Sequence, residues 1–362
     1  MATADGTWSY RDRFGEEFGR TYFRRFGDGV VSSLGLGTYL GEATDAVDEE
    51  YETAITAALE GGCNVLDTAI NYRHQRSERV VGRALDGSGI DREAVLVATK
   101  GGFVPFDGER PADPGAYVQE KYVDTGLVAR EELVRGSHCI APDFIDEQLE
   151  RSLSNLGLET IDLYYVHNPE TQLEARSREE VYDTLEGTFT RLEERVAAGD
   201  LRYYGVATWD AFRVRPEHAN YLSLPEVASR ARSAAKEAGN TATHLRAIQL
   251  PFNVHMADAF TVEAHEGAEG TESALWFAQK AGLNAFASAS IGQGRLAAGL
   301  PEAVAERLEG ESATQKAINF ARSAPGVTSA LVGMRSRDHV HENLDACRSD
   351  PMGADAFDSV FE

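Results

Sequence analysis

Eight short apolar runs, rich in β-branched residues, recur along the chain, and each is followed by a segment of helix-like character. Two of these segments, 143–158 and 178–199, space their apolar residues as an amphipathic helix does. Strands that alternate with helices predict βαβ units and a parallel sheet. Eight such units predict a closed (β/α)8 TIM barrel, an α/β fold, with an open doubly wound sheet as the alternative. The runs span residues 31–37, 64–69, 95–100, 161–167, 202–208, 245–250, 283–288 and 328–333.

The connection between the third and fourth runs is about twice as long as the others. The excess, at about 103–141, leaves the C-terminal end of the third strand, where the loops of a barrel form active sites. This insertion predicts either a lid or substrate-shaping subdomain, or a packing decoration on the surface. The aromatic residues Phe103, Phe106 and Trp209 are interpreted as part of the substrate pocket.

A β-hairpin is predicted ahead of the first barrel strand. The segment "YFRRFGDGVVSSLG" has two short β-like runs around a turn at Gly27-Asp28-Gly29. Such a hairpin is expected to plug the bottom of the barrel. The chain, 1–362, has a length within the range of barrel folds and is expected to form a single domain.

The chain carries a net charge of −24, from 59 acidic and 35 basic residues. This excess predicts neither nucleic acid nor an anionic membrane as a partner. An acid-rich, lysine-poor surface suits high salt, so we favour a salt-loving, halophilic host over an ordinary acidic cytosolic protein. No apolar run reaches the roughly 18 residues of a membrane span, and the N-terminus lacks an apolar signal core. Three widely spaced cysteines fit a reducing compartment, so a cytoplasmic location is expected.

Four polar residues follow the apolar runs at the ends that face an active-site mouth in a barrel. Asp67 ends the second run and Tyr72 lies in the loop after it. Lys100 ends the third run and His167 ends the fourth. Each has an ordinary structural explanation alone, but four from three neighbouring strands indicate a site.

These four side chains suit the chemistry of a carbonyl group. A free tyrosine has a pKa near 10. A neighbouring lysine ammonium is expected to lower the pKa of Tyr72 by stabilising the phenolate, and a carboxylate holds that lysine charged. Tyr72 could then give a proton to a carbonyl oxygen that His167 orients, as a hydride reaches the carbon.

The motifs "LDTAINY", "VATK" and "LYYVHNP" resemble, in order, those of the aldo-keto reductase superfamily. The resemblance extends from "SSLGLGTYLG" at 32–41 to "HVHENL" at 339–344. It implies a (β/α)8 fold and an NAD(P)H-dependent oxidoreductase that reduces aldehydes or ketones to alcohols. The catalytic tetrad of the family would be Asp67, Tyr72, Lys100 and His167, and no metal is expected.

The resemblance also implies residues around the nicotinamide. Thr38 and Tyr39 match positions near the ribose, and Gln249 matches the glutamine that binds the carboxamide. At two places the chain departs from the family. Thr208 follows an alanine where a Ser-Asn pair is common, and Ser288 stands where a tyrosine usually stacks on the nicotinamide.

The phosphates are expected after the last two strands, the usual phosphate end of such barrels. The segment "GQGR" offers a backbone cradle and a cation, and the strand-eight segment resembles the one that holds the adenosine 2′-phosphate in the family. Because Arg335 suits a phosphate, we favour NADPH over NADH. Alternatively, Ser336 and His339 only begin a helix. The candidate residues are Gly292, Gly294, Arg295, Arg335, Ser336, His339, Glu342 (nearer the adenine) and Asn343.

Two other functions stay open. Lys100 could form a Schiff base, as in an aldolase. The barrel could also bind NADPH without catalysis and act as a redox sensor. His255 and His265, in the loop after the sixth run, are interpreted as surface residues. The sequence predicts a small carbonyl substrate, but neither its identity nor the oligomeric state.

Overall fold

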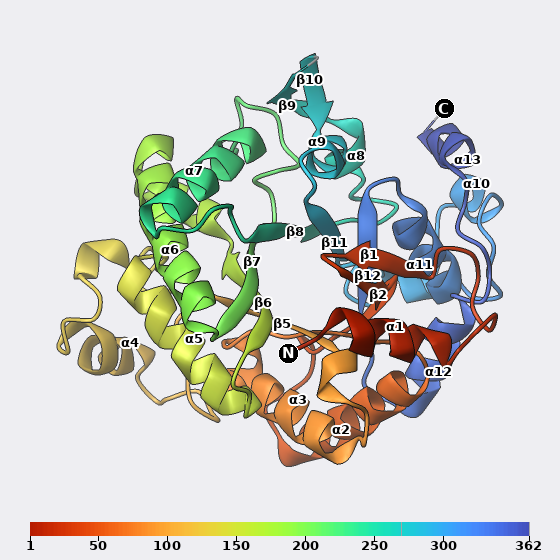
Figure 1. Cartoon of the computed structure of the whole chain (residues 1–362), viewed down its shortest axis with the longest axis horizontal. Helices are drawn as coiled ribbons and strands as arrows, with labels where there is room; N and C mark the ends of the chain where they lie inside the picture. The colour runs from red at the N-terminus through yellow and green to blue at the C-terminus, as the bar shows by residue number, and fades with distance from the viewer. Residues whose placement is uncertain (269, 362) are drawn as a thin grey trace.

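The structure, a computed structural model, describes residues 1–268 and 270–361 and has a closed barrel of eight parallel strands at its centre (Figure 1). Each strand coincides with one of the predicted apolar runs, so the (β/α)8 prediction is confirmed and the open-sheet alternative is wrong. The strands, in their order around the barrel, are β11 (Asn284–Ser288), β12 (Val327–Gly333), β3 (Leu34–Gly37), β4 (Val65–Asp67), β5 (Leu96–Gly101), β6 (Ile161–His167), β7 (Leu201–Ala207) and β8 (Leu245–Pro251).

Helices surround the strands and bury their apolar faces against them (Figure 1). The sequence sets their ends. Ser177 and Glu180 form a capping box at the start of α6, and Gly199 ends it in the left-handed conformation. The larger helices around the barrel are α2 (Asp45–Glu60), α3 (Arg76–Gly87), α5 (Pro142–Leu156), α6 (Arg178–Ala198), α7 (Leu224–Glu237), α9 (Ala274–Lys280), α11 (Ala313–Ser323) and α12 (Arg337–Asp345).

The N-terminal hairpin closes one end of the barrel, as predicted. Its strands β1 (Phe23–Phe26) and β2 (Gly29–Ser32) pair in antiparallel register, with Phe26 opposite Gly29. The Phe26 ring packs edge-on against the rings of Tyr203 and Phe286 inside the barrel. A short helix, α1 (Ala4–Asp12), precedes the hairpin.

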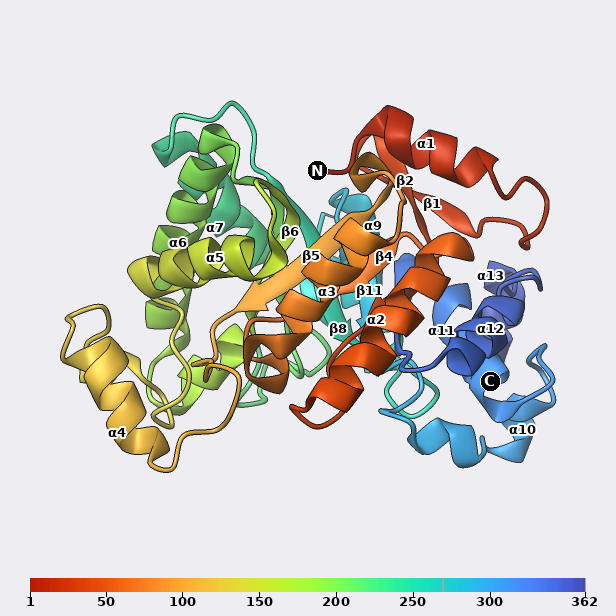
Figure 2. The same cartoon turned by 90° about the horizontal axis from the view of Figure 1, so that it is seen from below.

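The insertion is a compact excursion with its own apolar cluster. It contains α4 (Pro114–Val118), a π-helical turn at Gln119–Val123 and a 3-10 turn at Arg130–Glu132. Figure 2 shows α4 on the side toward which the β5 arrow points, with the hairpin at the opposite end. The insertion therefore stands beside the C-terminal ends of the strands.

The segment after β8 holds a second hairpin that the sequence analysis did not predict. It consists of β9 (Glu263–Gly267) and β10 (Gly270–Ser273), after the short helix α8 (Asp258–Thr261). His265 lies in β9 and is fully buried, so its interpretation as a surface residue is wrong, whereas His255 is exposed. The remaining short helices are α10 (Glu302–Ala305) and α13 (Ala354–Asp358). No helix in the described ranges has both the length and the apolar character to cross a membrane.

Candidate active site

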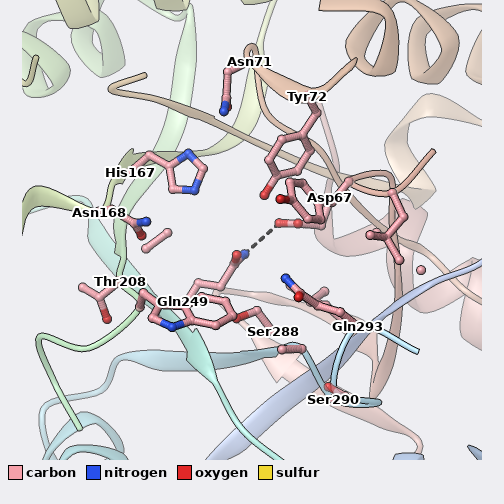
Figure 3. Close-up of a pocket in the computed structure, with 18 of the residues that line it drawn as sticks. Asp67, Asn71, Tyr72, His167, Asn168, Thr208, Gln249, Ser288, Ser290 and Gln293 are labelled. Atoms are coloured by element: carbon pink, nitrogen blue, oxygen red, sulfur yellow. Dashed lines mark hydrogen bonds between the residues drawn. The ribbon is translucent and has the colours of Figure 1, made fainter. Parts of the chain in front are cut away.

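A cavity of about 360 Å³ opens at the C-terminal end of the barrel. Figure 3 shows Tyr72, His167 and Gln249 converging on it from different elements. Parallel strands bring their carboxyl ends to one edge, which explains why residues far apart in sequence meet here. The last residues of six barrel strands line it, and Gln249, two residues before the end of β8, adds a seventh strand: Gly37, Asp67, His167, Ala207, Ser288 and Gly333.

A buried ion pair lies at the base of this cavity. Lys100 is fully buried, and its Nζ donates to Asp67 Oδ2 and to the Thr68 carbonyl oxygen, both at 2.7 Å. Gln249 Nε2 donates to the other carboxylate oxygen, Oδ1, at 2.7 Å. Burial lowers the pKa of the Lys100 ammonium, and the attraction of Asp67 opposes this change. The pair is thus a fixed part of the wall.

Tyr72 stands over this ion pair. Lys100 Nζ lies 4.9 Å from the centre of the Tyr72 ring, and the Tyr39 ring packs edge-on at 5.0 Å. Burial, and after it the negative charge of Asp67, raise the pKa of Tyr72 well above its ordinary value. The expectation that the pKa of Tyr72 is lowered is therefore wrong for this structure, because burial and the negative charge of Asp67 both disfavour the phenolate. Tyr72 keeps its proton at neutral pH.

The backbone after Tyr72 has an unusual conformation. Arg73, His74 and Gln75 have φ angles of 48°, 58° and 71°, in the left-handed region that favours glycine. Side-chain anchors hold this turn. The buried Arg73 guanidinium pairs with Asp48, and Gln75 Nε2 donates to the Phe106 carbonyl oxygen at 2.8 Å. These contacts fix the direction in which the Tyr72 side chain projects from the backbone.

His167 faces Tyr72 across the cavity, with ring centres 6.1 Å apart. Burial, followed by the positive charge of Lys100, lowers the pKa of His167 well below its ordinary value, so the ring is neutral. Its Nδ1 atom has no hydrogen-bond partner among the described residues. A neutral imidazole with an unpaired nitrogen can hydrogen-bond a ligand.

His138, at the end of the insertion, lies behind His167. Its Nε2 is 2.8 Å from the His167 carbonyl oxygen, and its Nδ1 is 2.9 Å from Gln172 Nε2. Because a carbonyl oxygen only accepts, Nε2 carries the proton. Burial lowers the pKa of His138 to about 4, which keeps this arrangement neutral. The Phe103 ring packs edge-on against both histidine rings.

The residues expected around the nicotinamide divide into two groups. Tyr39, Thr208, Gln249 and Ser288 line the cavity, and Thr208 Oγ1 is buried without a hydrogen-bond partner among the described residues. Thr38 lies outside the lining, where its Oγ1 is 3.3 Å from the Asp67 carbonyl oxygen.

The loop after β11 reaches the cavity through Gln293 and Gly294. Gly292 and Arg295, the two other candidates of this loop, lie outside the lining. Arg295 is exposed and turns back, so that its Nε donates to the Gly292 carbonyl oxygen at 3.1 Å.

A second cavity, of about 350 Å³, continues the first. Arg335, His339, Glu342 and Asn343 line it. Ser336 lies outside the lining and caps α12 by accepting from the His339 backbone N–H at 3.2 Å. Four residues belong to both cavities, which therefore form one groove: Leu40, Ile291, Gly294 and Gly333.

The groove fits an elongated polar molecule. A Cβ atom added at Gly37 or Gly333 would meet no atom nearer than 3.7 Å, so the missing side chains leave room along the wall. Buried polar atoms without partners among the described residues, such as Thr208 Oγ1 and Asn71 Oδ1, lie at the inner end. Arg335, half-exposed and 2.9 Å from Glu50, supplies a cation at the outer end. This distribution of polar groups fits a dinucleotide with a phosphate.

Several lining residues were missed by the sequence analysis. Asn71, Asn168, Ser290 and Gln293 contribute polar atoms to the cavity. Of the three aromatic candidates, Phe103 and Trp209 line it and Phe106 does not. Asn71 and Asn168 stand beside Tyr72 and His167 in the sequence, and this adjacency was the available signal. No group of three His, Cys, Asp or Glu side chains that could hold a metal occurs in the described part of the chain.

Comparison with known proteins adds independent findings. Residues 33–220, more than half of the chain, match the model of the Aldo/keto reductase family. The aldo-keto reductase yakc (NADP(+)) of Schizosaccharomyces pombe is 28% identical over 200 residues, which cover 55% of this chain and 48% of that protein. The NADH-specific methylglyoxal reductase of Escherichia coli is 30% identical over 203 residues, 54% of each chain. The chain thus spans about half the length of these curated relatives.

A solved structure matches along nearly the whole chain. The aldo/keto reductase of Klebsiella pneumoniae in complex with NADP and acetate has a TM-score of 0.61 and 20% identity. The match covers 94% of each chain. At this identity the similarity establishes the barrel fold.

Proposed function

Because the chain belongs to the aldo/keto reductase family, we propose that it is an NAD(P)H-dependent oxidoreductase that reduces aldehyde or ketone carbonyls to alcohols. One observation carries the proposal. Asp67, Tyr72 and His167 come from separate elements and line a single cavity at the C-terminal end of the barrel, and the buried Lys100 contacts Asp67 and Tyr72 behind its wall. Barrel enzymes carry out their chemistry at that end.

We propose NADP(H) as the cofactor, and when bound it supplies the hydride. Gln249, Thr208 and Ser288 would hold the nicotinamide end, and Arg335 the 2′-phosphate. Arg335 and the NADP in the names of two similar proteins favour NADPH. The E. coli relative is NADH-specific by name, so the preference needs a direct test.

Tyr72 gives its proton to the substrate oxygen in this proposal. The neutral His167 donates a hydrogen bond to that oxygen and orients it. As Tyr72 loses its proton, the Lys100 ammonium, 4.9 Å from the ring centre, stabilises the phenolate that forms. Asp67 keeps Lys100 charged and in place. The raised pKa keeps the proton on Tyr72 until charge develops on the substrate oxygen.

The aldolase alternative is disfavoured. A Schiff base requires a neutral, accessible amine. Lys100 is fully buried and donates to Asp67 and to the Thr68 carbonyl oxygen, which favour its charged form.

The decisive experiment compares wild type with Tyr72→Phe. NADPH fluorescence titration should give similar affinities, because the phenol proton is not needed to bind the cofactor. Turnover on a panel of aldehydes and ketones should fall by about 10²- to 10⁴-fold, the usual contribution of a general acid. Tyr221→Phe is the matched control, since the Tyr221 hydroxyl donates to the Ala264 carbonyl oxygen away from the cavity.

Other outcomes have clear meanings. NADPH binding by both proteins with no turnover by either would support the redox-sensing alternative. An absence of NADPH binding would mean that Ala207 and Ser288 mark a lost nicotinamide site. Equal turnover by wild type and Tyr72→Phe would exclude Tyr72 as the acid.

A further inference from the structure

A depression of about 800 Å³ lies at the end of the barrel opposite the active site, beside the β1–β2 hairpin. We call it the basal cavity. Its walls come from the hairpin and from the N-terminal parts of four consecutive barrel strands. The lining residues are Arg24, Arg25, Gly27, Asp28, Tyr203, Arg246, Gln279, Gly282, Leu283, Asn284, Gly326, Val327 and Thr328.

The basal cavity is positively charged in a strongly acidic protein. Three arginines line it, whereas the chain as a whole has a net charge of −24. Asp28 is the one carboxylate among the lining residues, and it forms an ion pair with Arg202. The charge of the three arginines is therefore not neutralised from within the cavity.

Arg24 is partly buried, and its guanidinium donates to backbone carbonyl oxygens. Its partners are Thr21 at 3.1 Å, Val327 at 2.6 Å and Arg322. No carboxylate lies within 4 Å of it among the described residues. Burial, and after it the positive charge of Arg322, lower the pKa of Arg24 to about 9. Carbonyl oxygens satisfy part of its donors but carry no net charge, so the positive charge of Arg24 has no neutralising partner in the described part of the chain.

Arg25 and Arg246 also have no carboxylate partner in the described part of the chain. The Arg25 guanidinium lies 4.7 Å from the centre of the Trp8 ring, and that of Arg246 lies 5.7 Å from the Tyr203 ring. Arg246 donates to the Thr243 carbonyl oxygen at 3.0 Å. Stacking on aromatic rings leaves N–H donors of a guanidinium available to an anion.

We propose that the basal cavity binds a small oxyanion of the phosphate class. Phosphate oxygens match the paired N–H donors of guanidinium groups, and more than one negative charge suits three arginines. Arg24 and Arg25 belong to the β1–β2 hairpin and Arg246 belongs to β8, so a bound anion would link the hairpin to the barrel wall. Binding should therefore stabilise the fold, and it does not depend on the proposed function.

The test measures the thermal unfolding midpoint in millimolar phosphate and in pyrophosphate, each against potassium chloride of equal ionic strength. Millimolar concentrations avoid the general stabilisation that concentrated phosphate gives to any protein. The midpoint of wild type should rise with the oxyanion. The double variant Arg25→Gln/Arg246→Gln should bind at least roughly tenfold more weakly, since hydrogen bonds to charged groups contribute about 1.5–3 kcal/mol.

Two controls separate this site from others. Arg335→Gln removes the cation of the active-site groove, so the response that persists in this variant belongs to the basal cavity and should remain sensitive to Arg25→Gln/Arg246→Gln. Arg215→Gln changes the net charge equally without lining either cavity. Arg25→Gln alone covers the case in which the double variant does not fold, because the Arg25 side chain is exposed and stacks on the Trp8 ring at the surface. A wild-type midpoint equal in oxyanion and chloride, or an unchanged response in the arginine variants, would overturn the proposal.

Discussion

Tyr72 directly precedes a segment with a backbone conformation that most residue types avoid. Left-handed φ angles at non-glycine residues cost of the order of 1–3 kcal/mol each in strained cases, and Arg73, His74 and Gln75 adopt them in succession. The buried Arg73–Asp48 ion pair holds the turn against this strain. Contacts on the far side of its own loop thus help to orient the proposed proton donor.

His138 is expected to act through the position of His167. His138→Leu removes the donor to the His167 carbonyl oxygen and should lower kcat by roughly tenfold, in line with a lost buried hydrogen bond. His138→Gln keeps an N–H donor at similar reach and should recover most of the activity. Steady-state kinetics check this, together with the unfolding midpoint. A merely structural role would lower the midpoint of His138→Leu and leave kcat unchanged.

Glu170 should make stability depend on pH. Its Oε1 accepts from the Trp209 and Asp210 backbone N–H groups, its Oε2 has no partner in the described residues, and burial raises its pKa to about 7. The folded state therefore binds the proton more tightly than the unfolded state. Stability contributed by this proton is present below pH about 4.5 and is lost as pH rises through the folded pKa of about 7.

The size of that loss can be measured with Glu170→Gln, which keeps the accepting oxygen and does not titrate. Above pH 7 the variant should be more stable than wild type by about 3 kcal/mol, the free energy that corresponds to a pKa raised from 4.5 to about 7. Below pH 4.5 the two should converge. Urea unfolding at several pH values checks this, and parallel stability curves would contradict it.

The meeting of Asp67, Lys100 and His167 at one end of the barrel could be predicted from the sequence. Each ends an apolar run, and parallel strands bring such ends together. The direction of the Asn168 and Gln293 side chains could not be predicted, because both residues have left-handed backbones, with φ angles of 48° and 56°. Hydrophobic patterns do not specify such conformations.

At the scale of elements, the barrel strands were predictable because burial on both faces produces continuous apolar runs. The β9–β10 hairpin was not, since its strands, "EAHEG" and "GTES", carry no such run. Its presence also explains the burial of His265, whose ring is 2.9 Å from the Phe212 carbonyl oxygen. Tertiary packing, and not local pattern, formed this hairpin.

Close packing between strands gives an element-scale prediction. A Cβ atom added at Gly205 in β7 would lie 2.4 Å from the Ala247 carbonyl oxygen of β8 and 2.7 Å from the Tyr165 ring. Gly205→Ala should therefore destabilise the barrel by roughly 1–3 kcal/mol or more. Gly87→Ala, at an open helix end with no atom within 4 Å, should be neutral or stabilise by about 0.5 kcal/mol. Chemical denaturation compares the two, and equal stabilities would contradict the prediction.

At the scale of the whole molecule, charge is the dominant feature. Like charges on an acidic surface repel one another at low ionic strength, and salt shortens their range from about 10 Å at 0.1 M to about 3 Å at 1 M. With a net charge of −24, this screening should raise the free energy of unfolding. The halophilic origin that we propose depends on this gain.

Raising potassium chloride from about 0.1 M to about 2 M should increase the unfolding midpoint steadily, most steeply where the Debye length changes most. Sucrose at matched osmolality controls for solvent exclusion. A midpoint that does not respond to chloride would indicate an ordinary acidic protein.

The two ends of the insertion pair directly with each other. Cys139 N donates to the Gly102 carbonyl oxygen and Val104 N to that of Ser137, each at 2.8 Å. The insertion consequently leaves and rejoins the barrel through a narrow stem, and the entropy of closing it depends mainly on the distance between the two ends of that stem. Other contacts, such as that of Gln75 with the Phe106 carbonyl oxygen, fasten it to the segments around the barrel. The insertion can therefore be exchanged as one unit. Its tip is free to diverge among related chains or to be exchanged by an engineer, provided that Phe103 and His138 in the stem are kept.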